Sequence, residues 1–156
     1  FSNKTELVKT VTLHIFDIVK KGVDLIHAQE QNPIIELFEI KRFVMKHLKD
    51  EKSSPQYQLQ KYYPKIYKTL KQKQFKVMQE LIKENLAKGI QQKLFRATID
   101  IDFTARIYFH GMVGIKDKDL FPLENNSMNT LTTNHLEYHL RGISTDKGIK
   151  ELEKQL

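Results

Sequence analysis

The stretch that decides the fold is NKTELVKTVTLHIFDIVKKGVDLIHAQ, residues 3–29. Its apolar residues recur at spacings of three and four, which is the pattern of one long amphipathic helix with a face toward a core. Asn3, with Glu6 three residues later, predicts the helix start as an N-cap and its capping-box partner, although Ser2 could serve instead. The predicted core stripe consists of Leu7, Val8, Val11, Ile15, Ile18, Val19, Gly22, Leu25 and Ile26.

The same helical spacing continues along most of the chain. Asn32 and Pro33 suit the cap and first turn of a second helix, which the polar run at residues 50–55 ends. Pro64 starts or kinks a later helix, and Gly89 is placed to break or bend that helix near its end. The expected helices cover about residues 3–29, 33–48, 56–62, 64–89, 103–116 and 127–144, and a last turn or two would follow Ser144 or Thr145.

One segment departs from helical spacing. ATIDIDF, residues 97–103, alternates apolar and polar residues as a strand does, but it has no partner segment with which to form a sheet. We expect an extended connection there, with Asp100 or Asp102 capping the helix that follows. The sequence therefore predicts an all-α fold: an antiparallel bundle of about six helices that forms a single domain over residues 1–156.

Composition limits the class of protein. With 156 residues, 40% of them hydrophobic, the chain can bury a core without disulfides or metals. It has no cysteine, which excludes thiol nucleophiles and cysteine-bound zinc. No stretch reaches the roughly 20 apolar residues of a membrane span, and the first residues lack the order of a signal peptide. We expect a soluble protein with no membrane partner.

Positive charge is concentrated in residues 41–76. This segment holds eleven Lys or Arg residues against Asp50 and Glu51, a net charge of +9, whereas the rest of the chain is close to neutral at −2. Clustered lysines release counterions when they meet a nucleic-acid backbone, so a basic module that binds nucleic acid or an acidic protein is one interpretation. The alternative is a solvated lysine face, because Arg42 is the only arginine in the segment.

A search for catalytic chemistry finds little. The motif HLEYH places His135 and His139 at i and i+4 on one helical face, a spacing that can grip a metal. The hydrolytic zinc motif requires Glu after the first His, and Leu136 stands there instead. Packing or interface histidines are the favoured interpretation. Phosphate-binding glycine loops and nucleophile elbows are absent from the sequence, so we expect no enzyme activity, no cofactor and no metal site.

Two further patterns concern partners. The expected helix at residues 103–116 has apolar residues all around its circumference, and the helix at 127–144 mixes small, aromatic and aliphatic residues. A two-helix face shared across a homodimer would require both patterns. The predicted interface consists of Met112, Leu131, His135, Tyr138, His139 and Gly142. Aromatic residues of the middle helices could also line a small-molecule pocket, formed by Phe38, Tyr63, Tyr67, Met78, Tyr108 and His110. The alternative in both cases is that these residues complete the monomer core.

Three segments carry a resemblance to TetR-family transcriptional regulators. FSNKTELVKTV, residues 1–11, resembles the end of that family's helix-turn-helix and the start of its fourth helix, through Phe1, Lys4, Glu6 and Leu7. YHLRGISTDKGIKELE, residues 138–153, is similar to the final-helix motif of one subgroup. ENLAKGIQQKLFRATIDIDF, residues 84–103, resembles the turn between the seventh and eighth helices, although Lys93 stands where a glycine is common.

The resemblance implies a cytoplasmic homodimer that acts as a transcriptional regulator, most often a repressor. In this family an N-terminal helix-turn-helix head binds operator DNA, and a helical C-terminal body binds a small-molecule effector and dimerises through its last two long helices. This chain would be the body, with the head expected upstream of residue 1. Effector binding would move the helix at residues 3–29 and change the spacing of the two recognition helices, which must be about 34–36 Å apart to enter successive major grooves.

Overall fold

The computed structural model describes residues 2–47 and 55–156, and within these ranges the chain forms seven α-helices and no strand. The all-α prediction is confirmed. One helix more than expected is present, because the last turns of the chain form a short helix of their own. The helices are α1 (Lys4–His27), α2 (Pro33–His47), α3 (Pro55–Tyr62), α4 (Pro64–Gln91), α5 (Ile101–Gly114), α6 (Met128–Ile143) and α7 (Asp146–Glu153).

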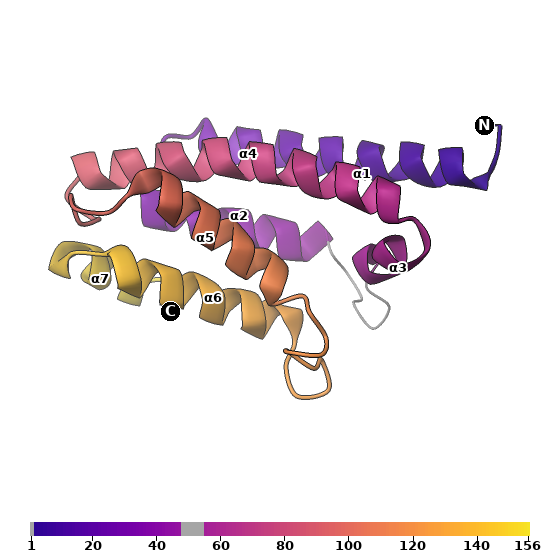
Figure 1. The fold of residues 1–156 in the computed structure, drawn as a ribbon. Helices are drawn as coiled ribbons and strands as arrows, with labels where there is room; N and C mark the ends of the chain where they lie inside the picture. The colour runs from indigo at the N-terminus through magenta and orange to yellow at the C-terminus, as the bar shows by residue number, and fades with distance from the viewer. Residues whose placement is uncertain (1, 48–54) are drawn as a thin grey trace.

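The long helices form an elongated bundle (Figure 1). α1 and α4 run side by side in the same direction, and α2 returns antiparallel to α1. α5 descends from the end of α4 across the front of the bundle, and α6 and α7 close its lower side. The N-terminal ends of α1 and α4 therefore lie at one end of the molecule, together with α3, while the turn between α4 and α5 lies at the other end.

Short polar side chains set the helix starts, as the sequence predicts. Asn3 Oδ1 accepts a hydrogen bond from the Glu6 main-chain N–H at 2.9 Å, and Asp100 Oδ1 accepts one from Phe103 at 2.9 Å. Thr145 Oγ1 accepts from the Gly148 main-chain N–H at 3.2 Å and begins α7. Each cap satisfies a main-chain donor that has no partner within its own helix. The predicted caps Asn3, Asp100 and Thr145 are confirmed.

The predicted core stripe of α1 is partly wrong. Val8, Val19 and Ile26 turn toward the bundle, and Val23, outside the predicted stripe, is the residue of α1 that is buried. The other large members of the stripe are 41–71% exposed: Leu7, Val11, Ile15, Ile18 and Leu25. Apolar residues occupy a wider arc of α1 than α2 and α4 cover, so the pattern located an apolar helix but misplaced the face that packs.

Gly89 does not end α4, which continues to Gln91. Its role is close packing: a Cβ at this position would lie 2.0 Å from the ring of Phe95, whose side chain is buried in the main core. The helix ends instead through Lys93, whose φ of 61° places it in the left-handed region. That conformation favours glycine, so Lys93 takes it at a cost of the order of 1 kcal/mol.

The main core lies where α2, α4, α5, α6 and α7 meet. It consists of buried aliphatic and aromatic side chains from these helices and from the turn after α4: Ile34, Leu37, Phe38, Ile82, Leu86, Leu94, Phe95, Ala105, Tyr108, Leu136, Leu140, Ile143 and Leu152. α5 contributes one side only, since Phe103 and Ile107 are 61% and 48% exposed. The expectation that α5 is buried on several sides is therefore not met within one chain.

Some residues named in the sequence predictions lie outside the described residues. The predicted loop at residues 50–55 lies outside them apart from Pro55, which begins α3, and so do Phe1 and Leu48. Within the described ranges, no helix has both the length and the apolar character that a bilayer crossing requires.

Candidate functional site

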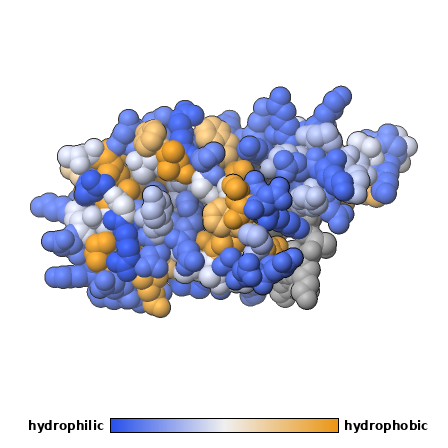
Figure 2. Space-filling view, turned by 60° about the horizontal axis from the view of Figure 1, so that its bottom comes forward, coloured by the Kyte–Doolittle hydropathy of each residue, from blue (hydrophilic) through white to orange (hydrophobic). Residues whose placement is uncertain are grey.

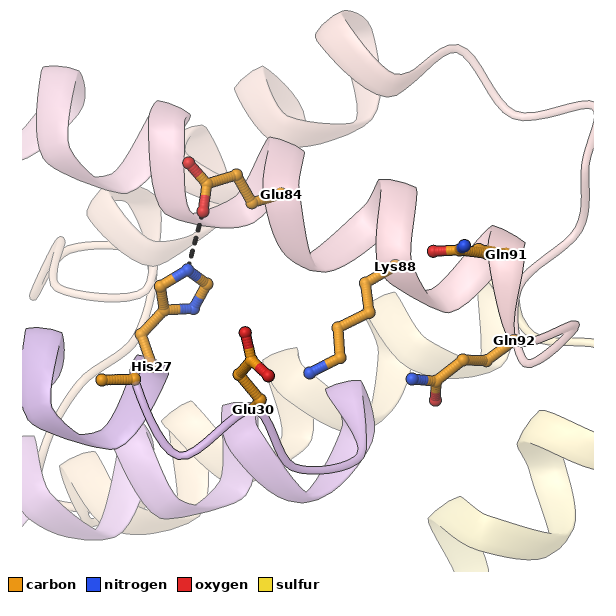
Figure 3. Close-up of a pocket in the computed structure, with 7 residues that line it drawn as sticks. His27, Glu30, Glu84, Lys88, Gln91 and Gln92 are labelled. Atoms are coloured by element: carbon orange, nitrogen blue, oxygen red, sulfur yellow. Dashed lines mark hydrogen bonds and ion pairs between the residues drawn. The ribbon is translucent and has the colours of Figure 1, made fainter.

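A polar cleft of about 570 Å³ lies between the C-terminal ends of α1 and α4. Figure 3 shows its side chains projecting from the end of α1 and the turn after it on one side, and from α4 on the other. The cleft is lined by His27, Ala28, Glu30, Glu84, Lys88, Gln91 and Gln92. Except for Ala28, each of these residues has a polar side chain, so a ligand here would be held by hydrogen bonds and charge rather than by apolar contact.

His27 links three helices at one edge of this cleft. Its Nε2 lies 2.7 Å from Glu84 Oε2 of α4, and its Nδ1 lies 3.2 Å from Glu36 Oε2 of α2. A neutral imidazole has one N–H donor, so both contacts are hydrogen bonds only when the ring is protonated. Burial lowers the pKa of His27, but the hydrogen bonds and charges of Glu84 and Glu36 outweigh it and raise that pKa above its usual value.

The partner Glu36 is unusual because its carboxylate is buried, with 1% of the residue exposed. Its second oxygen, Oε1, accepts a hydrogen bond of 3.1 Å from Asn85 Nδ2 of α4, which also donates to the Pro33 carbonyl oxygen at 2.9 Å. Lys88 Nζ donates to the Gln31 carbonyl oxygen at 2.8 Å. These contacts bind the turn between α1 and α2 to the C-terminal half of α4.

A second polar group lies inside the bundle, between α5 and α6. The rings of His135 and His139 both contact the ring of Tyr108, with centroid distances of 5.2 and 4.6 Å. His135 Nε2 donates to the Tyr108 carbonyl oxygen at 3.1 Å. His139 is 7% exposed, and its Nε2 has no hydrogen-bond partner among the described residues. Burial, together with the nearby His135, lowers the pKa of His139 to about 4.

Gly111 makes the close approach of α5 and α6 possible. A Cβ at this position would lie 2.2 Å from Cε1 of His135, so the imidazole occupies the space that a side chain would need. His135 is thereby fixed between the helices, where burial lowers its pKa. The two histidines of the HLEYH motif thus serve the contact between α5 and α6, and no group of three possible metal ligands forms within the described ranges.

The six predicted pocket residues lie in three different places. Phe38, Tyr108 and the partly buried Met78 meet in the main core. Tyr63 and Tyr67 belong to a separate cluster at the N-terminal half of α4, where they pack with Val8, Phe16, Leu59, Ile66 and Leu70. His110 is exposed on α5. The structure therefore places Phe38, Met78 and Tyr108 in one core cluster, with His139 packed on Tyr108, and the pocket itself stays a prediction.

The six predicted interface residues also lie in different places, some on the surface and some buried within the chain. Tyr138, at 78% exposure, and Gly142 face outward on α6. Leu131 and His139 are buried within the chain, while Met112 packs on the main core and His135 on Gly111. Where these two helices face outward, the surface is instead formed by Phe103, Ile107, His110 and Gly114 of α5 with Tyr138 and Gly142 of α6.

Sequence reasoning missed the cluster of His27, Glu36 and Asn85. One signal was present: Glu36 stands in the run PIIELF, between apolar residues that the predicted helix buries. A carboxylate at a core position requires a partner, and the partner had to come from another helix.

In comparisons with protein-family models, curated proteins and solved structures, no match to this chain was found.

Proposed function

We propose that this chain is the effector-sensing and homodimerisation body of a TetR-type transcriptional regulator. The observation that carries the proposal is the outward face of α5 and α6, defined above by its six residues. Phe103, Ile107 and Tyr138 are 61%, 48% and 78% exposed there, and nothing lies within 4 Å of where a Cβ would be at Gly114 or Gly142. Large apolar groups beside open glycines suit close packing against a second pair of helices.

The surface view supports the same reading. Figure 2 brings the lower side of Figure 1 forward, and hydrophobic groups interrupt the hydrophilic surface near its middle. A stable interface buries about 800 Å² on each partner, which two helices of this length can supply. Lys93 adds a further point: it adopts a left-handed conformation at the position where the family commonly has glycine.

The sensing part of the proposal rests on the interior. Phe38, Met78, Tyr108 and His139 meet between α2, α4, α5 and α6, and the Nε2 of His139 offers one unused hydrogen-bonding position in an apolar surrounding. An effector with an apolar body and one polar group would match it. The cluster at His27 would then transmit a shift of α2 or α4 to the end of α1, because His27 contacts both helices.

Sedimentation equilibrium at micromolar concentration tests the proposal. We expect the unmodified chain to be a dimer and Ile107→Glu to be a monomer, because a carboxylate would be buried without a partner in the interface. Leu25→Glu is the matched control, since Leu25 is a 71% exposed apolar residue of α1, and we expect it to leave the dimer intact. A monomeric unmodified chain, or loss of the dimer in both variants, would contradict the proposal.

A further inference from the structure

Six lysines lie on α3 and on the N-terminal half of α4. Residues 55–79 contain these lysines and neither Asp nor Glu. Each of the six is exposed, and we use the name lysine face for the group: Lys61 of α3, and Lys65, Lys68, Lys71, Lys73 and Lys76 of the N-terminal half of α4. The face carries a charge of +6 that no acidic residue in the same segment offsets.

No acidic side chain in the described part of the chain forms an ion pair with these lysines. The ion pairs between described residues do not include a lysine of the lysine face. Lys61 and Lys73 instead lie over the rings of Tyr62 and Phe16, 5.2 and 6.0 Å from the centroids. Further along α4, by contrast, Lys83 Nζ is 2.5 Å from Asp102 Oδ1.

The spacing of the lysines along α4 suits a regular row of negative charges. Lys65, Lys68 and Lys76 share one side of the helix, because three and eleven residues correspond to about one and three turns. From Lys65 to Lys76 the helix rises about 16 Å at 1.5 Å per residue. Phosphates of one DNA strand follow each other at about 3.4 Å along the axis, so this length matches about five of them.

The composition of the surface selects the class of partner. A membrane-binding helix needs apolar side chains beside its lysines, but the only large apolar groups exposed in the described residues 56–79 are Tyr57 and Tyr62. Protein interfaces are depleted of lysine at their centres. The segment contains no arginine, the residue best suited to bidentate reading of guanine. We propose that the lysine face binds the phosphate backbone of duplex DNA without reading its base sequence.

This inference does not depend on the dimer or on an effector. Fluorescence anisotropy of the full chain with two unrelated 20-base-pair DNA duplexes tests it. We expect similar affinities for both duplexes and a steep dependence on salt. Four phosphate contacts correspond to a slope of log K against log salt of about −3.6, or about a 150-fold loss between 50 and 200 mM salt. The triple variant Lys65→Gln, Lys68→Gln, Lys76→Gln removes three contacts and should reduce the magnitude of the slope by about 2.7.

A charge-matched control separates the lysine face from net charge. Lys21, Lys93 and Lys150 are exposed and lie outside residues 55–79, and their replacement by Gln removes the same three charges. We expect this control to keep a slope near that of the unmodified chain. An equal loss in both triple variants would overturn the proposal, as would absence of binding at 50 mM salt or tighter binding to phosphatidylserine vesicles than to DNA. Far-UV circular dichroism on both variants establishes that they remain folded.

Discussion

Two histidines that each contact at least one other helix, His27 and His139, stand in opposite environments. His27 sits where α1, α2 and α4 meet, with a carboxylate at each ring nitrogen, and its pKa is raised. His139 packs against Tyr108 between α5 and α6 with its Nε2 unpaired within the described part of the chain, and its pKa is lowered to about 4. One site is built to hold a charged imidazole and the other to hold a neutral one, so they should respond to pH with opposite signs.

The largest effect should come from removing the buried carboxylate beside His27. Glu36→Ala removes the carboxylate at His27 Nδ1 and one of the two hydrogen bonds that the buried Asn85 Nδ2 donates, and we expect it to lower the free energy of unfolding by about 3 kcal/mol. Urea denaturation followed by circular dichroism measures the change. Glu84→Ala is the matched control: this carboxylate contacts the same imidazole but is 66% exposed, so the loss should stay below about 1 kcal/mol. Equal losses would show that burial of Glu36 has no special role.

The next effect concerns His139 and appears at acid pH. Its folded pKa of about 4 is below the unfolded value of about 6.5, so the unfolded state binds more protons between these values and stability falls as the pH drops. From pH 7 to pH 5 this loss amounts to about 2 kcal/mol. The free energies of unfolding of the unmodified chain and of His139→Leu are measured at pH 7 and pH 5. The change with pH in the difference between the two proteins gives the contribution of His139. A difference that does not change with pH would refute a neutral, buried His139.

The smallest effect concerns His27 and appears at alkaline pH. Because its folded pKa is raised, its contribution to stability is complete below pH 6.5 and is lost as the pH rises through the folded pKa. The side chain is 32% exposed, so solvent screening limits the loss to about 0.5–1 kcal/mol. Comparison of the unmodified chain with His27→Gln at pH 6 and pH 9 measures it. The opposite sign, with the chain gaining stability relative to His27→Gln at pH 9, would contradict the two-carboxylate geometry.

Helix positions followed from the sequence because they depend on neighbouring residues. Asn3, Asp100 and Thr145 cap main-chain groups three residues away, and such contacts can be read from a local pattern. The face of each helix that packs could not be predicted in the same way. Tyr138 and His139 are adjacent, yet one is exposed and the other is buried, and the contact of His135 with Gly111 on another helix helps to set this orientation.

The candidate site was still harder to predict, since its residues are distant in the sequence. His27 and Glu36 are nine residues apart, and Glu84 is 57 residues from His27. No periodicity relates the three positions, and only the packing of α1, α2 and α4 brings them together. The pocket residues show the same limit: a count of aromatic residues grouped Phe38 with Tyr63, whereas the fold places them in two separate clusters.

The exposed stripe of α1 has a practical consequence for handling the protein. Five aliphatic side chains are 41–71% exposed along this helix: Leu7, Val11, Ile15, Ile18 and Leu25. Fluorescent dyes such as ANS bind apolar surface of this kind and are commonly used as reporters of unfolding. The native chain should therefore already fluoresce with such a dye at low temperature, and a melting curve recorded with it would begin high and show a reduced transition.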